Sequence, residues 1–262
     1  MQYKTAVLAA WPWVNRGSVA KGIVGYSRPA MLDTARITAI TLDLDDTLWP
    51  VMPTLVRAEA ALCDWLAPRA PRTAALFADT PRRLALRQEV LAQHPDYLHD
   101  LSFQRLRALA LGLARAGEDA ALAEPAFEVF FAARQQVDLY PQAAEVLQRL
   151  SARYPLLAVS NGNADVVRVG LGAYFSGSVS ARDAGVAKPD PRIFQAAAAH
   201  LGCAPHQVLH VGDDHAADVV GAAQAGMQAV WLRHPTAIEA PQSAHAHLVV
   251  DDLRHLCEAL GL

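Results

Sequence analysis

Short runs of apolar and β-branched residues recur along the chain and predict the strands of a sheet. The first run covers residues 37–42 and has the length and composition of a buried parallel strand. Four similar runs lie at residues 156–159, 208–211, 229–232 and 248–250. These runs predict at least five strands.

Helical patterns alternate with these runs from about residue 140 onward. Apolar residues at 143, 146, 147 and 150 have the spacing of one face of a helix. Asp190 followed by Pro191 predicts a helix N-cap and the first helical position after it. Because strands and helices alternate, we expect an α/β fold with a parallel sheet and right-handed crossovers.

Residues 53–137 interrupt this alternation. They contain no convincing strand pattern, and Phe103, Leu106, Leu109 and Leu113 lie at helical spacing. We therefore predict a helical cap at 53–137, inserted into a core that is made of residues 36–52 and 138–262.

The first 35 residues predict a poorly ordered N-terminal extension. Pro12 interrupts their one short apolar stretch, and no clear small-residue cleavage site follows it. We favour an extension, or an upstream mis-start before Met31, over a targeting signal.

Polar residues gather where three of the predicted strands end. These residues are Asp43 and Asp45; Ser160 and Asn161; and Asp213, Asp214 and Asp218. In parallel sheets, ligands bind at the carboxyl ends of the strands. Each residue alone could form a turn or a cap, but carboxylates that crowd together need a cation or protons. Oxygen ligands of this kind suit Mg²⁺.

Together these residues could support transfer of a phosphoryl group. The Asp43 carboxylate could attack phosphorus, and Asp45 could protonate the leaving alkoxide. Ser160 and the backbone N–H groups at Leu44 and Asn161 could bind phosphate oxygens. Lys188, which alone would read as a solvated surface residue, could neutralise the phosphate charge.

The composition of the chain narrows the range of binding partners that we expect. The net charge is −3, with 53% hydrophobic and 19% charged residues, so neither a nucleic-acid footprint nor a polybasic membrane patch is expected. No apolar run is long enough to cross a bilayer. Cys63, Cys203 and Cys257 lack metal-site spacing, so we expect reduced thiols in a cytoplasmic protein. The pattern leaves open whether the protein is a monomer or a homodimer.

The polar clusters resemble the motifs of the haloacid dehalogenase superfamily, in their order along the chain. The motifs are Asp43–Thr47, Ser160, Lys188, and Gly212–Asp214 with Asp218. The resemblance implies a Rossmann-like core, with Mg²⁺ bound by the Asp43 carboxylate, the Asp45 backbone carbonyl and Asp213. It implies an outer shell of Asp218 and Asp214, and a helical cap of the C1 type.

Reaction and substrate are separate questions, because this superfamily includes dehalogenases, mutases and phosphonatases. Dehalogenases of this superfamily lack the second aspartate of the first motif. The presence of Asp45 therefore favours phosphate esters as substrates. A phosphomutase and a non-catalytic binding protein that retains the fold stay open as alternatives.

Residues 42–49, 160–164 and 210–229 are similar to proteobacterial phosphatases of flavin mononucleotide (FMN) and of 5-amino-6-(5-phosphoribitylamino)uracil. The same likeness includes His99-Asp100 followed by Arg105 and Arg107. It makes His99 and Arg105 candidates for substrate contacts in the cap, and a small phosphorylated metabolite the expected partner. Other sugar or nucleoside monophosphates remain alternative substrates.

Overall fold

The computed structural model describes residues 31–233 and 245–262, which divide into two compact units. The core unit contains the described residues up to Val51 and from Gln135 onward, and the helical unit contains residues 52–134. The sequence predicted the cap at 53–137. Most of the predicted N-terminal extension, residues 1–30, lies outside the described residues.

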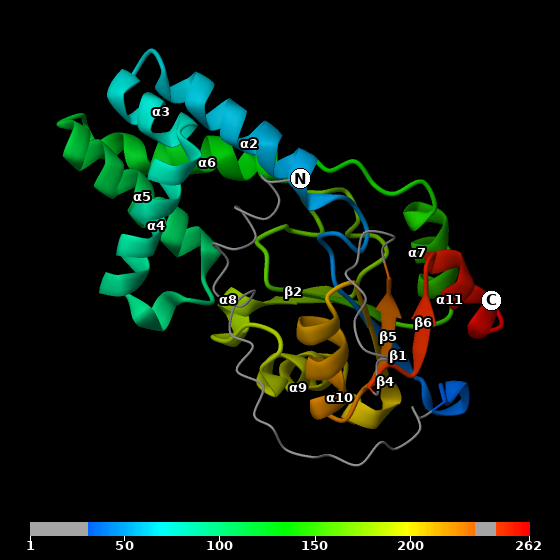
Figure 1. Ribbon diagram of the computed structural model, residues 1–262. Helices are drawn as coiled ribbons and strands as arrows, with labels where there is room; N and C mark the ends of the chain where they lie inside the picture. Colours follow the sequence, from blue (N-terminus) through cyan, green and yellow to red (C-terminus); the bar gives the residue numbers. More distant parts are fainter. Residues whose placement is uncertain (1–30, 234–244) are drawn as a thin grey trace. The chain divides into compact units, whose positions relative to one another are not determined.

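The core unit contains a sheet of six parallel strands in the order β3-β2-β1-β4-β5-β6 (Figure 1). The strands are β1 (Ala39–Leu42), β2 (Leu156–Ser160), β3 (Gly177–Ser180), β4 (Val208–Gly212), β5 (Gln228–Leu232) and β6 (Leu248–Val250). The predicted α/β fold is confirmed. Strands β2, β1 and β4 are adjacent, so the polar residues that follow them meet at one edge of the sheet.

Strand β3 is absent from the prediction. Its sequence is Gly-Ser-Val-Ser, and Val179 is the residue of the strand that is buried. It pairs with β2 at the end of the sheet. A strand held mainly by backbone pairing at an edge needs no apolar run, so its sequence carries little pattern.

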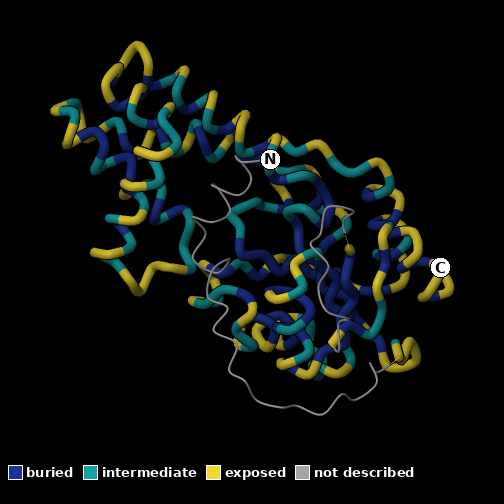
Figure 2. The backbone as a smooth tube through the Cα atoms, in the orientation of Figure 1, coloured by how far each residue is buried: buried dark blue, intermediate teal, exposed yellow. Residues whose placement is uncertain are grey.

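Helices cover both faces of the sheet within the core unit. Leu156 and Ala158 of β2 face a cluster that includes α7 (Ala143–Ser151) and α11 (Leu253–Ala259). Leu157 and Val159, which alternate with them, face a cluster that includes α9 (Pro191–His200) and α10 (Gly221–Gln224). Figure 2 shows the resulting burial along the strands. Burial on both faces explains why these strands read as continuous apolar runs.

The predicted start of α9 is confirmed. Asp190 is its N-cap and accepts a hydrogen bond from the Arg192 backbone N–H at 3.0 Å, with Pro191 at the first turn. The remaining short elements of the core unit are η1 (Thr34–Arg36), α8 (Ala181–Ala184), η4 (Pro205–Gln207) and the π-helical turn η5 (His215–Val220).

The helical unit has its own hydrophobic core. Its elements are α2 (Val51–Leu66), α3 (Pro71–Ala78), α4 (Thr80–Gln93), η2 (Pro95–Tyr97), α5 (Leu101–Ala116), η3 (Ala120–Leu122) and α6 (Ala123–Arg134). Leu62, Phe77, Leu109, Leu113 and Phe130 are almost fully buried there. Two of these, Leu109 and Leu113, belong to the apolar spacing noted in the sequence.

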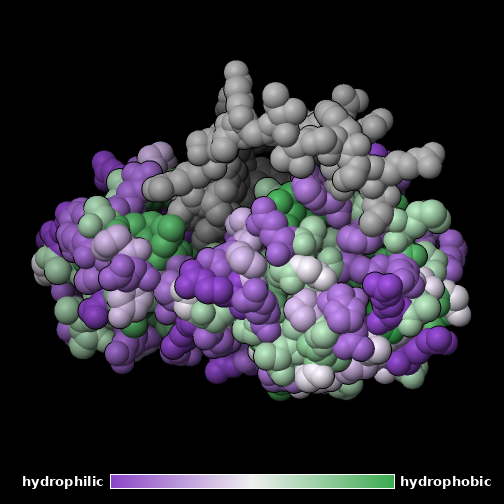
Figure 3. Space-filling model, turned by 90° about the horizontal axis from the view of Figure 1, so that it is seen from below, coloured by the Kyte–Doolittle hydropathy of each residue, from purple (hydrophilic) through white to green (hydrophobic). Residues whose placement is uncertain are grey.

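The surface is mixed in character. On the face that Figure 3 shows, hydrophilic and hydrophobic residues of the described chain are interspersed. No helix among the described residues is long and apolar enough to span a membrane.

Candidate active site

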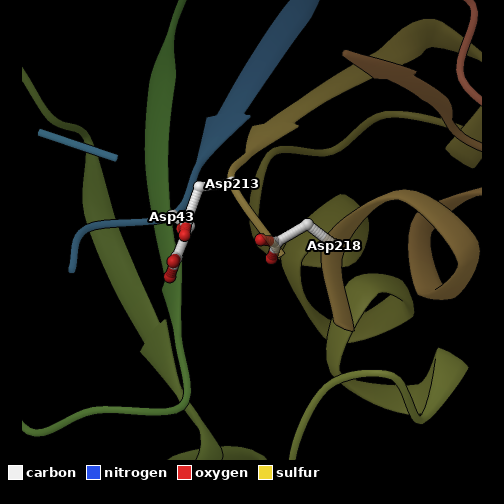
Figure 4. Close-up of side chains that lie close together, drawn as sticks. All are labelled: Asp43, Asp213 and Asp218. Carbon is white, nitrogen blue, oxygen red and sulfur yellow. The ribbon is translucent and has the colours of Figure 1, made fainter. Parts of the chain in front are cut away.

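Three aspartates from separate elements point toward one another at the carboxyl edge of the sheet (Figure 4). Asp43 follows β1, Asp213 follows β4, and Asp218 lies in η5. The Asp43 backbone N–H donates to the Val211 carbonyl at 2.9 Å, so β1 and β4 remain paired up to the site. One carboxylate oxygen from each aspartate lies within 4.8 Å of the others.

Lys188 joins two of these aspartates. Its Nζ donates to Asp43 Oδ1 at 2.7 Å, to Asp218 Oδ1 at 2.7 Å and to the Val159 carbonyl at 2.9 Å. The side chain is 2% exposed. Burial alone would lower its pKa, but the charges of Asp218 and Asp43 outweigh burial and raise the pKa. Lys188 is therefore a fixed cation with all three N–H donors engaged.

Asn161 holds the backbone of Lys188 in place. The Asn161 Nδ2 donates to the Lys188 carbonyl at 3.0 Å, and the Lys188 N–H donates to Asn161 Oδ1 at 2.7 Å. The side chain thus fastens the Lys188 loop to the end of β2. The sequence assigned the Asn161 backbone N–H to phosphate binding. These side-chain contacts leave that prediction open.

Asp218 is surrounded by donors. Its Oδ1 contacts Lys188 Nζ and lies 3.2 Å from His210 Nε2, while its Oδ2 accepts from the Asp214 N–H at 2.9 Å. Burial raises the pKa of Asp218, but the positive charge of Lys188 outweighs it and holds the pKa below its ordinary value. With these partners, Asp218 positions Lys188, which leaves Asp43 and Asp213 as the carboxylates available to a cation.

Packing around Asp218 explains the glycine in the fourth motif. A Cβ atom on Gly212 would lie 2.2 Å from the Asp218 Cγ. Only glycine leaves room for the Asp218 carboxylate at this position.

A buried histidine also supports Asp218, and the sequence analysis missed it. His210 in β4 is fully buried, and its Nδ1 lies 2.9 Å from Thr41 Oγ1. Burial lowers the pKa of His210, so the ring is neutral. Within a strand that reads as core, His210 and Thr41 carried no signal that they belong to the site.

Asp45 lies in a tight turn after β1. Its Oδ1 accepts from Trp49 Nε1 at 2.9 Å, which orients the carboxylate. The turn continues through Asp46, whose φ is 59°, and the Asp46 N–H donates to the Trp49 carbonyl at 2.7 Å. The turn therefore brings the second aspartate of the motif back beside the end of β1.

Asp213 and Asp214 have different surroundings. The Thr47 hydroxyl donates to Asp213 Oδ1 at 3.2 Å, and Trp231 Nε1 donates to the Asp213 carbonyl at 2.9 Å. Asp214 instead caps η5, because its Oδ1 accepts from the Ala216 and Ala217 N–H groups. The sequence placed Asp214 in an outer metal shell, and the structure shows its carboxylate engaged as a cap.

The crowded carboxylates raise one another's pKa values. Burial raises the pKa of Asp43 to about 7, with Asp218 and Asp45 adding to the effect and Lys188 opposing it. Burial and the charge of Asp43 raise the pKa of Asp213 well above its ordinary value. Asp43, Asp213 and Asp218 face a single lysine, so a divalent cation would offset excess negative charge. The all-oxygen donor set fits Mg²⁺, which Asp43 and Asp213 would hold.

Two further predicted phosphate ligands lie beside this cluster. Ser160 ends β2, is 4% exposed, and its Oγ accepts from the Gly162 N–H at 2.9 Å. The Leu44 side chain is buried, so the predicted contact with phosphate would be made by the Leu44 backbone N–H. Phosphate binding by both residues stays a prediction.

The cap candidates lie in the helical unit. His99 is half-buried in the turn before α5. Arg105 forms a bidentate pair with Glu59, at 2.7 and 3.2 Å, and its guanidinium lies 3.5 Å from the centre of the Phe130 ring. The sequence spacing pointed to Arg105 but not to Glu59, 46 residues away along the chain.

Comparison with known proteins shows which enzyme family contains a site of this kind. A family model described as haloacid dehalogenase-like hydrolase matches residues 37–226, which include Asp43, Lys188 and Asp218. The chain belongs to this hydrolase family. The resemblance inferred from the four motifs is confirmed.

Relatives in the family differ in their named reactions. The chain is 35% identical to 5-amino-6-(5-phospho-D-ribitylamino)uracil phosphatase YigB of Escherichia coli K12, over 76% of this chain and 84% of that protein. It is 37% identical to a phosphoserine phosphatase of Thermus thermophilus, over 60% of this chain and 66% of that protein. Among solved structures, a 2-haloacid dehalogenase from Pseudomonas syringae pv. Tomato DC3000 is 37% identical with a TM-score of 0.80, covering 86% of this chain and 98% of that one.

Proposed function

We propose that this hydrolase releases phosphate from small phosphomonoesters, with Asp43 as nucleophile and Asp45 as general acid and base. The observation that carries the proposal is the Asp45 carboxylate, which Trp49 Nε1 orients and whose charge helps to raise the pKa of Asp43. An alkoxide leaving group needs a proton, whereas a halide does not. The second carboxylate, Asp45, therefore favours phosphate esters as substrates. Haloacids are the substrates in the name of one similar solved structure.

The chemistry would proceed in two displacements. A carboxylate oxygen of Asp43 attacks phosphorus, the bond to the ester oxygen breaks, and Asp45 supplies the proton to that oxygen. Asp45 then takes a proton from a water molecule, which attacks the aspartyl-phosphate and releases inorganic phosphate. Because Lys188 binds Asp43 Oδ1, it fixes the direction in which the other oxygen points.

The remaining charged and polar groups would stabilise the transferred phosphoryl group. Lys188, the Ser160 hydroxyl and the backbone at Leu44 and Asn161 would bind its oxygens. Bound Mg²⁺, held by Asp43, Asp213 and the Asp45 carbonyl, would neutralise part of the charge on the phosphate.

For the substrate, we infer FMN or 5-amino-6-(5-phosphoribitylamino)uracil. The similarity to the E. coli phosphatase over most of both chains supports the ribitylaminouracil compound, and the motif resemblance supports FMN. The proposed site would also accept other sugar or nucleoside monophosphates, and a phosphomutase would use the same acid. A panel of phosphorylated metabolites that contains these compounds, assayed for phosphate release with Mg²⁺, selects among them by kcat/KM.

Substitution at the two aspartates tests the chemistry. Asp43→Asn should abolish turnover while leaving circular dichroism and the unfolding midpoint nearly unchanged, because asparagine has the same shape but is not a nucleophile. Asp45→Asn should lower kcat by about 10²- to 10⁴-fold, since it removes the general acid and base.

Asp190→Asn is the matched control. The Asp190 carboxylate caps α9 and pairs with Arg192 rather than with a residue of the site, and asparagine caps helices equally well, so activity should stay at the wild-type level. Full activity of Asp43→Asn would remove Asp43 as nucleophile. Wild-type protein that released phosphate from no phosphomonoester in the presence of Mg²⁺ would favour a non-catalytic binding protein.

A further inference from the structure

Three arginines gather around one carboxylate in the helical unit. Glu59 lies on α2, Arg83 and Arg87 on α4, and Arg105 on α5. Glu59 Oε1 lies 2.7 Å from Arg105 Nη2 and 3.5 Å from Arg83 Nε. The side chains of Glu59, Arg83 and Arg105 are 12–20% exposed, so the cluster is largely buried yet still reaches the surface of the unit.

The charges of this guanidinium cluster (Glu59, Arg83, Arg87 and Arg105) do not balance. Among the described residues, Glu59 is the carboxylate that pairs with these arginines, so three positive charges meet one negative charge. Burial and the nearby positive charge of Arg105 lower the pKa of Arg87 to about 10. Burying cations without counter-charges is costly, and such an excess marks a place where an anion is favoured.

Arg87 provides a second observation. Its Nη2 is inaccessible to solvent and has no hydrogen-bond partner among the described residues. Its Nε donates to Gln104 Oε1 at 2.8 Å, and Gln104 Nε2 in turn donates to the Tyr97 and Leu98 carbonyls. The guanidinium is thus held in one orientation by a residue that is itself fixed, while part of its donor capacity is unused.

We propose that the guanidinium cluster is a second anion site, which binds a small oxyanion, either carboxylate or phosphate. Planar guanidinium groups bind such anions through paired N–H donors. Arg105 already shows this geometry with the Glu59 carboxylate. An ion pair with a purely structural role would need only one arginine for Glu59, and no carboxylate in the described part of the chain pairs with Arg87.

The oxyanion has two sources. It can be an anionic group of the phosphorylated metabolite, in which case the inference rests on the proposed function. It can also be a free anion that binds the helical unit independently of turnover. The two sources share one recognition chemistry and give different kinetic results.

Binding is tested first, without turnover. Inorganic phosphate is titrated into the full chain without Mg²⁺, and the Nε–Hε signals of the arginine side chains are followed by NMR, assigned by single Arg→Lys variants. The signals of Arg87 and Arg105 should shift in a saturable manner. Arg115, which pairs with Glu89 on the surface of the same unit, is the internal control and should not follow the same curve.

Arg87→Gln should weaken phosphate binding at this site by about tenfold or more, the usual loss when a charged hydrogen-bond donor is removed. Arg115→Gln should leave the affinity unchanged. If no arginine side-chain signal of the folded wild-type protein shifts in a saturable manner with millimolar phosphate, the cluster is a structural ion pair and the inference is wrong. Because that outcome needs no signal assignment, a variant that fails to fold does not obscure it.

The source of the anion is tested by comparing kcat/KM for monophosphates with and without a second anionic group. A loss of about tenfold in Arg87→Gln, confined to the doubly anionic compounds, assigns the site to the substrate. Equal kcat/KM values in wild type and variant, together with the NMR response, assign it to a free anion. Absence of any phosphatase activity would overturn the proposed function alone, because the NMR titration is independent of catalysis.

Discussion

At the scale of single residues, Lys188 organises the candidate site. It links Asp43, the proposed nucleophile, to Asp218, and Asn161 fixes its backbone. These contacts use up most of the hydrogen-bonding capacity of Asp218, whereas burial and the neighbouring negative charges raise the pKa values of Asp43 and Asp213. A cation at the proposed Mg²⁺ site would offset both effects.

Mg²⁺ affinity should therefore depend on pH. The pKa of Asp43 is about 7 in the folded protein, compared with an ordinary value of 3.8, and that of Asp213 is also raised. Below these values a proton must leave before the cation binds, so affinity should increase as the pH rises from about 5 to about 8. Isothermal titration in two buffers of different ionisation enthalpy should show proton release near pH 6 that diminishes toward pH 8.

Asp43→Asn provides the control for that titration, since it removes one of the two titrating ligands and should flatten the pH dependence along with weakening binding. Equal wild-type affinity at both ends of this pH range would contradict the assignment of Asp43 and Asp213 as the ligands.

At the scale of secondary structure, the ends of elements position the chemistry. Strands β1 and β4 stop at adjacent positions, and η5 turns Asp218 back toward them. The start of η5 depends on Asp214, which accepts hydrogen bonds from the Ala216 and Ala217 N–H groups at 2.8 and 2.9 Å. Asp214, which the sequence placed in an outer metal shell, thus caps the element that carries Asp218.

Substitution of Asp214 should separate capping from charge. Asp214→Ala removes the cap and should lower the free energy of unfolding by about 1 kcal/mol, with faster hydrogen exchange at residues 215–220. Asp214→Asn keeps a capping oxygen and should stay close to wild type in both measurements. If the alanine and asparagine variants lost the same free energy of unfolding, the charge of Asp214 rather than its capping hydrogen bonds would stabilise η5.

At the scale of the whole molecule, each compact unit has its own hydrophobic core. Two clusters lie on the two faces of the sheet, and a third lies among the helices of residues 52–134. Leu109 is fully buried in the third cluster, and Leu147 of α7 is fully buried on one face of the sheet.

Core truncations should therefore act on one unit at a time. Leu109→Ala should cost about 2–5 kcal/mol in the helical unit and raise hydrogen exchange there, while Mg²⁺ binding by the core unit persists. Leu147→Ala, the matched control, should have the reverse pattern. Equal loss of protection in both units for either variant would show that they unfold as one cooperative body.

The sequence alone determined the parallel α/β fold and the polar residues at the strand ends, and it predicted a helical cap at 53–137. Strands buried on both faces and amphipathic helices leave local patterns that depend only on neighbouring residues. The motifs could be found for the same reason, since each is a short segment at the end of one element. Strand β3 was missed because an edge strand with one buried residue leaves almost no pattern.

Only the tertiary structure decided which partners the site residues have. Lys188 and Asp43 are 145 positions apart, and no local pattern predicts that their side chains form a 2.7 Å contact. In the same way, no local pattern predicted that the Asn161 side chain holds the Lys188 backbone, and Arg105 was noted without the carboxylate that binds it. Charge balance around a buried group depends on every chain segment that packs against it, and folding alone brings those segments together.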